Sequence, residues 1–202
     1  MRNTIEGMRD DGVPTFYAES PAAWRAWLLE NHDQAESVWL IIYKKDSGTP
    51  SITYPEAVDG GLCFGWIDSK PNKRDDKSFF QYFSKRNPKS NWSRVNKEKI
   101  ARMLDAGLMH ESGLRMVDLA KETGTWTALD DVENLVIPDD LAAAFAEYEQ
   151  ATNFFAAFPR SVKRGILEWI FNAKRPATRQ KRIAQTAEMA SRNERANQYR
   201  KS

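Results

Sequence analysis

The sequence predicts an α+β fold, with a small, mainly antiparallel sheet, flanking helices and a C-terminal helical subdomain. Segments rich in β-branched and aromatic residues occur in the first half of the chain, at residues 37–45, 66–70 and 78–84. After residue 138, apolar residues recur at helical spacing. With 202 residues, of which 41% are hydrophobic, the chain can bury the core of one full-sized domain and of a helical appendage.

Four regions are predicted along the chain. Residues 1–14 are polar and lack a periodic pattern, so they are expected to form a flexible leader. Residues 15–126 form the predicted α+β domain, residues 137–195 the helical module and residues 196–202 a frayed tail. The stretch 126–138 has no clear period and contains several acids, which predicts a linker between the two domains.

A first helix is predicted after Ser20. Serine is a preferred N-cap, and Pro21 suits the first helical position. The helix is expected to continue to about His32. Its buried face is expected to carry Trp24, Trp27 and Leu28.

Strands are predicted on both sides of this helix in the sequence. Phe16 and Tyr17 are predicted to pair as an edge strand. Residues 37–45 are apolar on both alternating faces, so they are predicted to form a central strand covered on both sides.

A helix over residues 55–63 and a strand from Trp66 are predicted to follow one another directly, with Gly65 ending the helix. Polar side chains that leave this strand can meet a ligand. The strand is expected to pair in antiparallel fashion with residues 78–84, across an exposed and charged hairpin loop at residues 71–77.

The remaining elements are predicted to be helices. Ser90 or Ser93 caps a helix that runs to about Ala106, and a second helix spans residues 112–123. Their buried sides are expected to carry Ile100, Met103, Leu104, Leu114 and Val117. Helices of the second half are predicted at residues 139–148, 150–158 and 160–173 and from Pro176 onward.

The cysteine and histidine content restricts the possible chemistry. Cys63 is the only cysteine, so an internal disulfide is impossible, and with two histidines it cannot complete a Cys/His structural zinc site. We therefore predict no metal and no cofactor. Cys63 is expected to be a buried core residue, His32 a surface residue near a helix end and His110 part of a connector.

The location of the protein is predicted from its apolar segments. The N-terminal residues lack the apolar run of a signal peptide, and no stretch reaches membrane-spanning length. We therefore expect a cytoplasmic protein without membrane insertion.

Polar side chains near the predicted strand ends form a candidate ligand-binding site. Its members are Lys44, Lys45, Tyr54, Glu56, Trp66, Asp68 and Ser69. Asp68 beside lysines can bind a cation or an amine, and Asp68 or Glu56 can act as a general acid or base if burial raises its pKa. The alternative, which we favour, is that Asp68 caps a turn and Lys44 pairs with Glu56. No residue is therefore assigned as catalytic.

Aromatic residues offer a second kind of candidate surface. Such side chains can stack with single-stranded nucleic acid or contact an apolar ligand, but alternation along a strand sends about half of them into the core. The residues concerned are Trp39, Trp66, Phe79, Phe80, Tyr82 and Trp92.

The C-terminal region is basic although the net charge of the whole chain is only +2. Residues 160–202 contain 12 Lys and Arg against 3 Asp and Glu. On one helix, Arg175, Arg179 and Arg182 would share a face, which together with Lys174 suits an extended anion such as a phosphate chain or an acidic partner. The alternatives are ion pairs with the acidic residues 130–140 of the same chain, or simple solvation. Nucleic acid is a less favoured partner, since a basic stripe is only one of its signs.

Motifs along most of the chain resemble one bacterial family. In the first half they are Trp24-Arg25-Ala26-Trp27-Leu28, Val38-Trp39-Leu40, Tyr43-Lys44-Lys45, and the run from Tyr54 to Ser69. In the second half they include Pro138-Asp139-Asp140-Leu141, Trp169-Ile170, Ala173-Lys174-Arg175 and Arg182-Ile183. In these motifs the chain resembles the YdeI or OmpD-associated (OmdA-like) bacteriocin-protection proteins. The order of elements in the first half is also similar to that of small frataxin-like (YdhG-like) α+β proteins.

This resemblance implies a function in stress resistance. The family is linked with resistance to bacteriocins and cationic antimicrobial peptides, and the resemblance implies no particular reaction. We therefore expect a non-enzymatic protein that binds an unknown small ligand or protein partner. The alternatives are a small-molecule enzyme that uses Asp68 or Glu56, and a protein that binds nucleic acid or another anion through its basic last helix.

Overall fold

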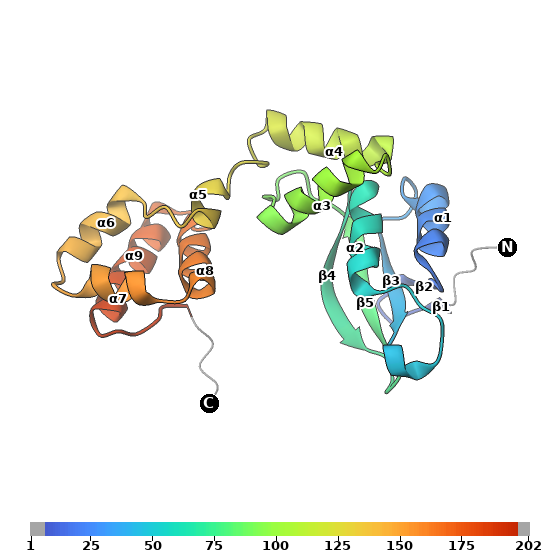
Figure 1. Cartoon of the computed structure of the whole chain (residues 1–202), viewed down its shortest axis with the longest axis horizontal. Helices are drawn as coiled ribbons and strands as arrows, with labels where there is room; N and C mark the ends of the chain where they lie inside the picture. The colour runs from blue at the N-terminus through green and yellow to red at the C-terminus, as the bar shows by residue number, and fades with distance from the viewer. Residues whose placement is uncertain (1–6, 198–202) are drawn as a thin grey trace. The chain divides into compact units, whose positions relative to one another are not determined.

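The computed structural model describes residues 7–197 and shows an α+β protein, as predicted (Figure 1). The chain forms two compact units, Met1–Thr127 (unit 1) and Ala128–Ser202 (unit 2). The division falls at the start of the region that we predicted to be a linker. Each unit has its own apolar core.

Unit 1 contains a sheet of five strands within the described residues, in the order β1-β2-β3-β5-β4. The strands are β1 (Gly7–Met8), β2 (Pro14–Tyr17), β3 (Ser37–Tyr43), β4 (Trp66–Lys73) and β5 (Ser78–Lys85). The pairs β1–β2, β3–β5 and β4–β5 are antiparallel, and β2–β3 is parallel. The central position of β3 and the β4–β5 pairing are confirmed.

Two predictions about the start of the chain are wrong. The strand at Phe16 is not an edge strand, because β1 pairs with β2 on its outer side. Residues 7–14 belong to the fold, since the Arg9 guanidinium lies 4.6 Å from the centroid of the Trp39 ring and Asp11 accepts a 3.0 Å hydrogen bond from the Trp39 indole. The part of the predicted leader before Gly7 lies outside the described residues.

The helices of unit 1 are α1 (Pro21–Asn31), the 3-10 helix η1 (Lys45–Ser47), α2 (Tyr54–Cys63), α3 (Arg94–Asp105) and α4 (Glu111–Glu122). The serines predicted as N-caps of α1 and α3 have that role. Ser20 accepts a hydrogen bond from the Ala23 amide, and Ser93 accepts one from the Asn96 amide, which satisfies first-turn donors of α1 and α3.

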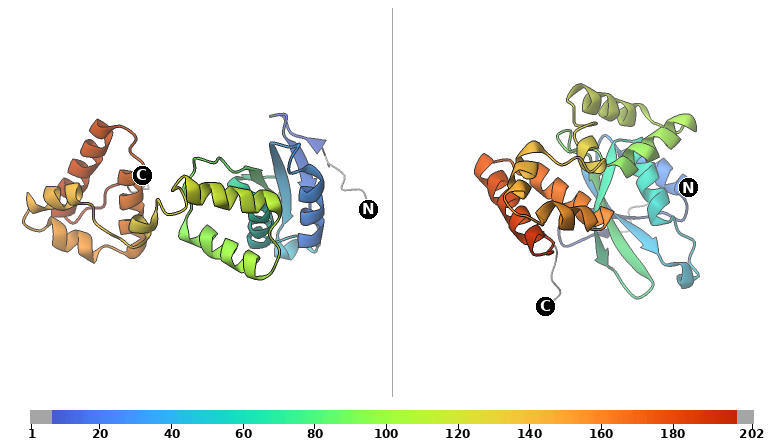
Figure 2. Two further views of the ribbon diagram at one scale, coloured as in Figure 1. Left: turned by 90° about the horizontal axis from the view of Figure 1, so that it is seen from above. Right: turned by 60° about the vertical axis from the view of Figure 1, so that its left-hand side comes forward.

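Helices α1 and α2 lie against one face of the sheet (Figures 1 and 2). Trp24 and Trp27 of α1 are buried there, and the Trp24 indole donates a 3.0 Å hydrogen bond to the Ala57 carbonyl of α2. A side chain at Gly60 would place its Cβ 2.7 Å from Trp24, so glycine permits this close approach of the two helices.

The hairpin loop between β4 and β5 is shorter than predicted. Strand β4 continues to Lys73, because an irregularity between Asp68 and Pro71 lets pairing resume with Gln81. The remaining loop is closed by Asp75, whose carboxylate accepts hydrogen bonds from the backbone amides of Lys77 and Ser78 at 2.8 and 2.7 Å.

Two leucines expected in the core are exposed. Leu104 is 46% and Leu114 is 37% exposed, whereas Ile100 and Val117 are buried on the same two helices. Each helix therefore contacts the rest of unit 1 through a narrower face than its apolar residues suggest.

Unit 2 is entirely helical within its described residues. Its helices are α5 (Asp130–Glu133), α6 (Asp139–Ala146), α7 (Ala151–Ala157), α8 (Arg160–Phe171) and α9 (Pro176–Ser191). The prediction of a linker before residue 138 is wrong, because Leu129 and Val132 are buried in the core of this unit. Ala196 is 1% exposed, so the predicted frayed tail starts too early, and its residues from 198 onward lie outside the described part.

Candidate functional site

The structure separates the polar residues that were predicted to meet at the strand ends. Asp68 pairs with Phe83 of β5, whereas Tyr43, the residue before Lys44, pairs with Ser78 of the same strand. Phe83 and Ser78 are five residues apart, which corresponds to about 16 Å along β5. The Lys44 ammonium donates a 2.8 Å hydrogen bond to the Asp76 carbonyl at the β4–β5 hairpin. Lys44 and Lys45 therefore do not share a site with Asp68.

Tyr54 and Asp68 do come together. The Tyr54 hydroxyl donates a 2.6 Å hydrogen bond to the Asp68 carboxylate. Burial, and then the neighbouring Asp68, raises the pKa of Tyr54 to about 12, so the phenol remains a donor at neutral pH. Because this pair connects the start of α2 to β4, it acts as a structural contact in the unliganded protein.

Glu56 has a structural role at the start of α2. Its carboxylate accepts 2.8 and 2.7 Å hydrogen bonds from the amide and the hydroxyl of Thr53, completing a capping box. These bonds lower the pKa of Glu56, which weakens it as a general base. The predicted ion pair between Lys44 and Glu56 is wrong, since each has a different partner.

The aromatic candidates divide between the two faces of the sheet. Trp66, Phe79 and Trp92 pack with the core beneath the helices, and Trp66 contacts Trp27 edge-on at 5.8 Å. On the other face, the centroid of the Trp39 ring lies 6.1 Å from that of Phe80 and 4.9 Å from that of Tyr82. Ser69 is exposed on β4. No single stacking surface therefore unites the six aromatic residues.

Two members of the predicted basic group have partners inside unit 2. Arg179 forms a bidentate pair with Asp140, with distances of 2.7 and 2.9 Å, as one alternative predicted. Arg182 donates to the Trp169 carbonyl and stacks on its ring. Arg175 is the N-cap of α9 and has an extended backbone, so it does not lie on one helical face with the other two arginines.

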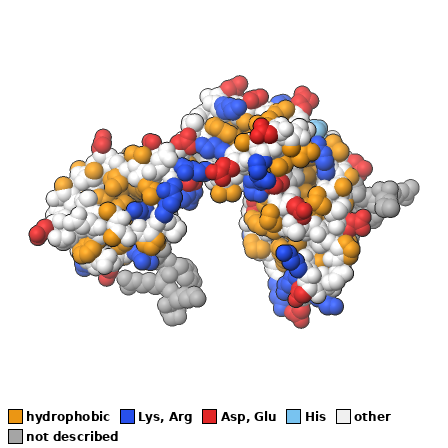
Figure 3. Space-filling view, in the orientation of Figure 1, with side chains coloured by type: hydrophobic (Ala, Val, Ile, Leu, Met, Phe, Trp, Pro, Cys, Tyr) orange, Lys and Arg blue, Asp and Glu red, His pale blue; other side chains and the backbone are white. Residues whose placement is uncertain are grey.

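Lys174 and Arg175 are exposed, and anion binding by them stays a prediction. Figure 3 shows acidic as well as basic side chains on both units. The basic composition of the C-terminal region therefore does not by itself indicate a nucleic-acid interface.

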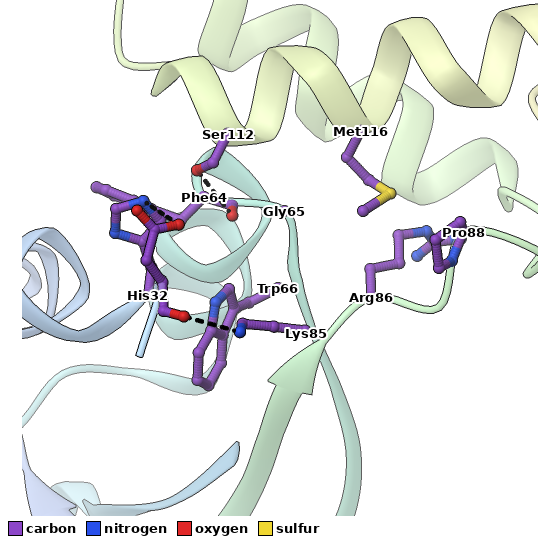
Figure 4. Close-up of a pocket in the computed structure, with 10 residues that line it drawn as sticks. His32, Phe64, Gly65, Trp66, Lys85, Arg86, Pro88, Ser112 and Met116 are labelled. Atoms are coloured by element: carbon purple, nitrogen blue, oxygen red, sulfur yellow. Dashed lines mark hydrogen bonds and ion pairs between the residues drawn. The ribbon is translucent and has the colours of Figure 1, made fainter. Parts of the chain in front are cut away.

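A cavity of about 310 Å³ lies where β4 begins and β5 ends (Figure 4). It is built from the end of α1, the turn between α2 and β4, the end of β5 and the first turns of α4. Its lining residues are His32, Asp33, Phe64, Gly65, Trp66, Lys85, Arg86, Pro88, Ser112 and Met116. Trp66 is the only one of them that the sequence singled out for ligand binding.

The turn at Phe64 and Gly65 holds the cavity together. Gly65 has a φ of +76°, and its carbonyl accepts a 2.9 Å hydrogen bond from the Arg86 amide. The Ser112 hydroxyl donates to the Phe64 carbonyl at 3.0 Å. A Cβ at Gly113 would lie 2.2 Å from the Cys63 carbonyl oxygen, so α4 contacts this turn directly.

Arg86 is the unusual residue of the cavity wall. Its side chain is buried, with 5% of the residue exposed, and its guanidinium lies 3.8 Å over the Trp92 ring. Nη2 donates a 2.6 Å hydrogen bond to the Asn91 carbonyl, whereas the buried Nε has no acceptor. Burial lowers the pKa of Arg86 to about 10, which still leaves the group protonated at neutral pH.

The other charged groups of the cavity have partners. Lys85 donates to the Asp33 carbonyl at 3.0 Å and to the Glu36 carboxylate at 2.7 Å. His32 donates through Nδ1 to the Leu28 carbonyl at 2.9 Å, and its Nε2 lies 3.3 Å from the Asp33 carboxylate. Among the residues that the structure describes, no carboxylate pairs with Arg86.

The two histidines lie together beside this cavity. His110 lies in the connector between α3 and α4, as predicted, and His32 lies at the end of α1, but the predicted surface position of His32 is wrong. His32 is only 9% exposed and contacts His110 at 4.7 Å between ring centroids. His110 is the N-cap of α4 and stacks on Phe64. Burial, and then the proximity of His32, lowers the pKa of His110. Within residues 7–197, no group of three or more histidine, cysteine, aspartate or glutamate side chains is arranged to hold a metal ion.

A second cavity, of about 350 Å³, lies between α1, α2 and α3. Its acidic wall residue Asp59 is paired with Lys99 and Arg102. Cys63 also lines it and is buried, as predicted, and burial raises the pKa of its thiol. Arg25 also lines it and donates a 2.9 Å hydrogen bond to the Leu108 carbonyl, but Arg25 is less buried than Arg86. Because Asp59 is paired, the thiol is protonated and its arginine is more exposed to solvent, this cavity is the weaker candidate.

Sequence patterns did not predict the cavity near Arg86. Its residues come from positions 32 to 116, and their association depends on the sheet register. The run Lys85-Arg86-Asn87-Pro88 indicated only the end of a strand. The one available signal was a basic pair that directly follows an apolar strand.

Comparison with known families gives one match in each unit. Residues 16–116, half of the chain, match the family model described as a domain of unknown function (DUF8412). Residues 134–193 match the family model described as bacteriocin-protection, YdeI or OmpD-associated, which indicates a function related to bacteriocin protection. No curated protein and no solved structure matches the chain, so the frataxin-like character of the first half stays a prediction. None of the described helices has the length and apolar character needed to cross a membrane.

Proposed function

This chain belongs to the DUF8412 family through residues 16–116, and we propose that it is a non-enzymatic ligand-binding protein. Because residues 134–193 match the bacteriocin-protection, YdeI or OmpD-associated model, we propose further that it protects its host against bacteriocins and cationic antimicrobial peptides. The cavity beside Arg86 in unit 1 is its ligand site. The observation that carries this proposal is the cavity itself, which combines apolar walls with a few polar groups.

The construction of the cavity supports a binding role. Its turn is held by backbone and side-chain hydrogen bonds from β5 and α4, so the site exists without a ligand. A preformed site loses little conformational freedom when a ligand binds. The acid–base alternative has less support, because Glu56 is a helix cap and Asp68 accepts the Tyr54 hydrogen bond.

The proposal is tested by the survival of a deletion strain of the native host under a bacteriocin or a cationic antimicrobial peptide. Met116→Trp fills the cavity without changing its charge, and Leu114→Trp on the same helix is the matched control because Leu114 is exposed and does not line the cavity. The intact gene and the control are expected to restore survival, whereas Met116→Trp is expected to fail although it accumulates and melts normally.

Two results would contradict the proposal at different points. Full rescue by a folded Met116→Trp variant would show that the cavity is not the working site. Unchanged survival of the deletion strain under every agent tested would show that the protective role itself is wrong.

We also propose that the protein acts in the cytoplasm. Its single cysteine is buried and unpaired, which suits a reducing compartment. Fractionation of host cells with an antibody against the protein tests this, and recovery in the envelope fraction would refute it.

A further inference from the structure

We propose that the cavity beside Arg86 binds a small amphipathic anion, whose carboxylate or phosphate group contacts the Arg86 guanidinium while its apolar or aromatic body lies against Phe64, Trp66, Pro88 and Met116. This inference rests on the proposed ligand-binding function and specifies the chemistry of the ligand. It follows from the charge, the hydrogen bonding and the shape of the cavity.

Arg86 is a buried cation to which no carboxylate within residues 7–197 is paired. Removing a charged group from water is costly unless an opposite charge and hydrogen bonds compensate it. Arg164 shows how the same chain compensates a more exposed arginine, since it contacts the carboxylates of Glu133 and Glu168 at 2.8 and 2.9 Å. A bound anion would supply to Arg86 the charge that the protein itself supplies to Arg164.

The guanidinium of Arg86 is held in one orientation. One face lies over Trp92, and Nη2 is bound to the Asn91 carbonyl. Nε also lacks an acceptor, but protein atoms enclose it, so a ligand oxygen in the cavity would meet the guanidinium through its other N–H groups. An arginine fixed in this way recognises planar or tetrahedral oxyanions with little further loss of side-chain entropy.

The surrounding charges are compatible with an anion. Lys85 adds a second positive charge at the cavity, although it already contacts Glu36. Asp33 is the one acid among the lining residues; its side chain is 72% exposed and lies 3.3 Å from His32. Glu36, the partner of Lys85, has a side chain that is 82% exposed. Solvent therefore screens both of these negative charges, whereas the charge of Arg86 is desolvated.

The rest of the wall specifies the body of the ligand. Pro88 is exposed and Met116 is half-buried, so they provide most of the accessible apolar wall, and Met116 can adjust its shape. Phe64 and Trp66 also line the cavity, but they are only 2% and 1% exposed and contribute little accessible surface. The volume of about 310 Å³ lies at the small end of ligand pockets, which suits an aromatic or short aliphatic acid better than a nucleotide or a peptide. Inorganic phosphate would use the cation but leave the apolar wall uncovered.

Calorimetric titration of the full chain with benzoate and with its neutral isostere benzamide tests the inference. The two probes share size and ring, so the difference in affinity reports the charge. Benzoate is expected to bind at least about thirtyfold more tightly than benzamide, because the interaction between two desolvated opposite charges increases affinity by at least that factor. Phenyl phosphate in place of benzoate shows whether a phosphate or a carboxylate is preferred, and inorganic phosphate alone is expected to bind more weakly than either.

Two variants assign the effect to Arg86. Arg86→Met keeps most of the side-chain volume but removes the charge, and is expected to reduce benzoate affinity at least about thirtyfold while benzamide affinity changes little. Lys89→Met is the matched control, since Lys89 is exposed and does not line the cavity. It is expected to change benzoate affinity less than about threefold.

The outcomes are distinguishable. Equal binding of benzoate and benzamide, or full benzoate affinity in a folded Arg86→Met variant, would overturn the anion inference and leave the ligand-binding function standing. The inference would also be overturned if none of the four probes binds at a concentration on the order of 10 mM, because a dissociation constant above that value corresponds to very weak binding. If Arg86→Met does not fold, the difference in affinity between benzoate and benzamide for the unaltered protein decides whether the anion inference holds.

Discussion

Arg86 in unit 1 and Arg179 in unit 2 show opposite relations between charge and environment. The region around Arg179 is the more basic by composition, yet Arg179 is paired with Asp140 through two hydrogen bonds. Arg86 belongs to the part of the chain with more acids than bases, yet it is buried and has no carboxylate partner among the residues that the structure describes. Counting charges along the sequence therefore does not show which arginine lacks a partner, because compensation depends on the groups around each charge and not on the number of charges.

The largest stability effect is expected where a buried pair is broken in unit 2. Arg164→Met leaves the Glu133 carboxylate, whose side chain is 8% exposed, without its arginine partner. We expect the free energy of unfolding of unit 2 to fall by about 3 kcal/mol, since removing one partner of a buried ion pair is costly. Urea denaturation followed by the fluorescence of the tryptophans measures it, and a loss below about 1 kcal/mol would show that Glu133 is compensated in another way.

A smaller effect is expected for the more exposed pair. Arg179→Met removes a bidentate contact in which the Asp140 side chain is 47% exposed. Because solvent screens such a pair, the expected loss is about 1 kcal/mol or less, and it should shrink in 1 M salt. Denaturation at low and high salt checks both points, and a loss independent of salt would indicate that packing of the side chain dominates.

Arg86→Met is expected to change the stability of unit 1 by less than about 1 kcal/mol in either direction. The variant loses the hydrogen bond to the Asn91 carbonyl but also loses the cost of burying a charge, and the two effects oppose each other. The contrast with Arg164→Met sharpens the comparison of the two units. A loss of about 3 kcal/mol without any ligand would mean that the surroundings already stabilise the Arg86 charge.

The smallest effect concerns pH and the histidines beside the cavity. The pKa of His110 is lowered from 6.5, so between that value and its folded pKa the unfolded chain binds more protons than the folded one. Stability of unit 1 is therefore expected to fall as the pH falls below about 6.5. His110→Asn keeps an N-cap residue at α4 and should reduce this slope, as thermal unfolding between pH 5 and pH 8 can show. An unchanged slope would assign the pH dependence to other groups.

Local patterns were sufficient to predict most of the individual elements. Ser20 and Ser93 cap helices as expected, and residues 37–43 form the central strand, because these features depend on neighbours in the sequence. The short strand β1 and the helix α5 were not predicted. Both are too short to show a period, and they exist because β2 and the core of unit 2 offer them partners.

The predicted ligand site was only partly assembled by the fold. Tyr54 and Asp68 meet, but Lys44 lies at the far end of the sheet, because the antiparallel β3–β5 register places it beside the hairpin. The sequence shows where a strand stops. Which end of the sheet that residue reaches depends on how the strand pairs with its neighbours. The sequence reasoning placed all these ends together and was wrong on that point.

The sequence by itself determined the α+β class, the helix starts, the central strand and the family relationship of the second half, since each depends on local spacing or on ordered motifs. The tertiary structure decided which charges are compensated. Arg179 meets Asp140 across 39 residues, whereas the Arg86 guanidinium meets the Asn91 carbonyl and the Trp92 ring, and no carboxylate of the described residues is paired with it. The physical reason is that desolvation and pairing depend on distances in space, and residues far apart in the sequence set those distances.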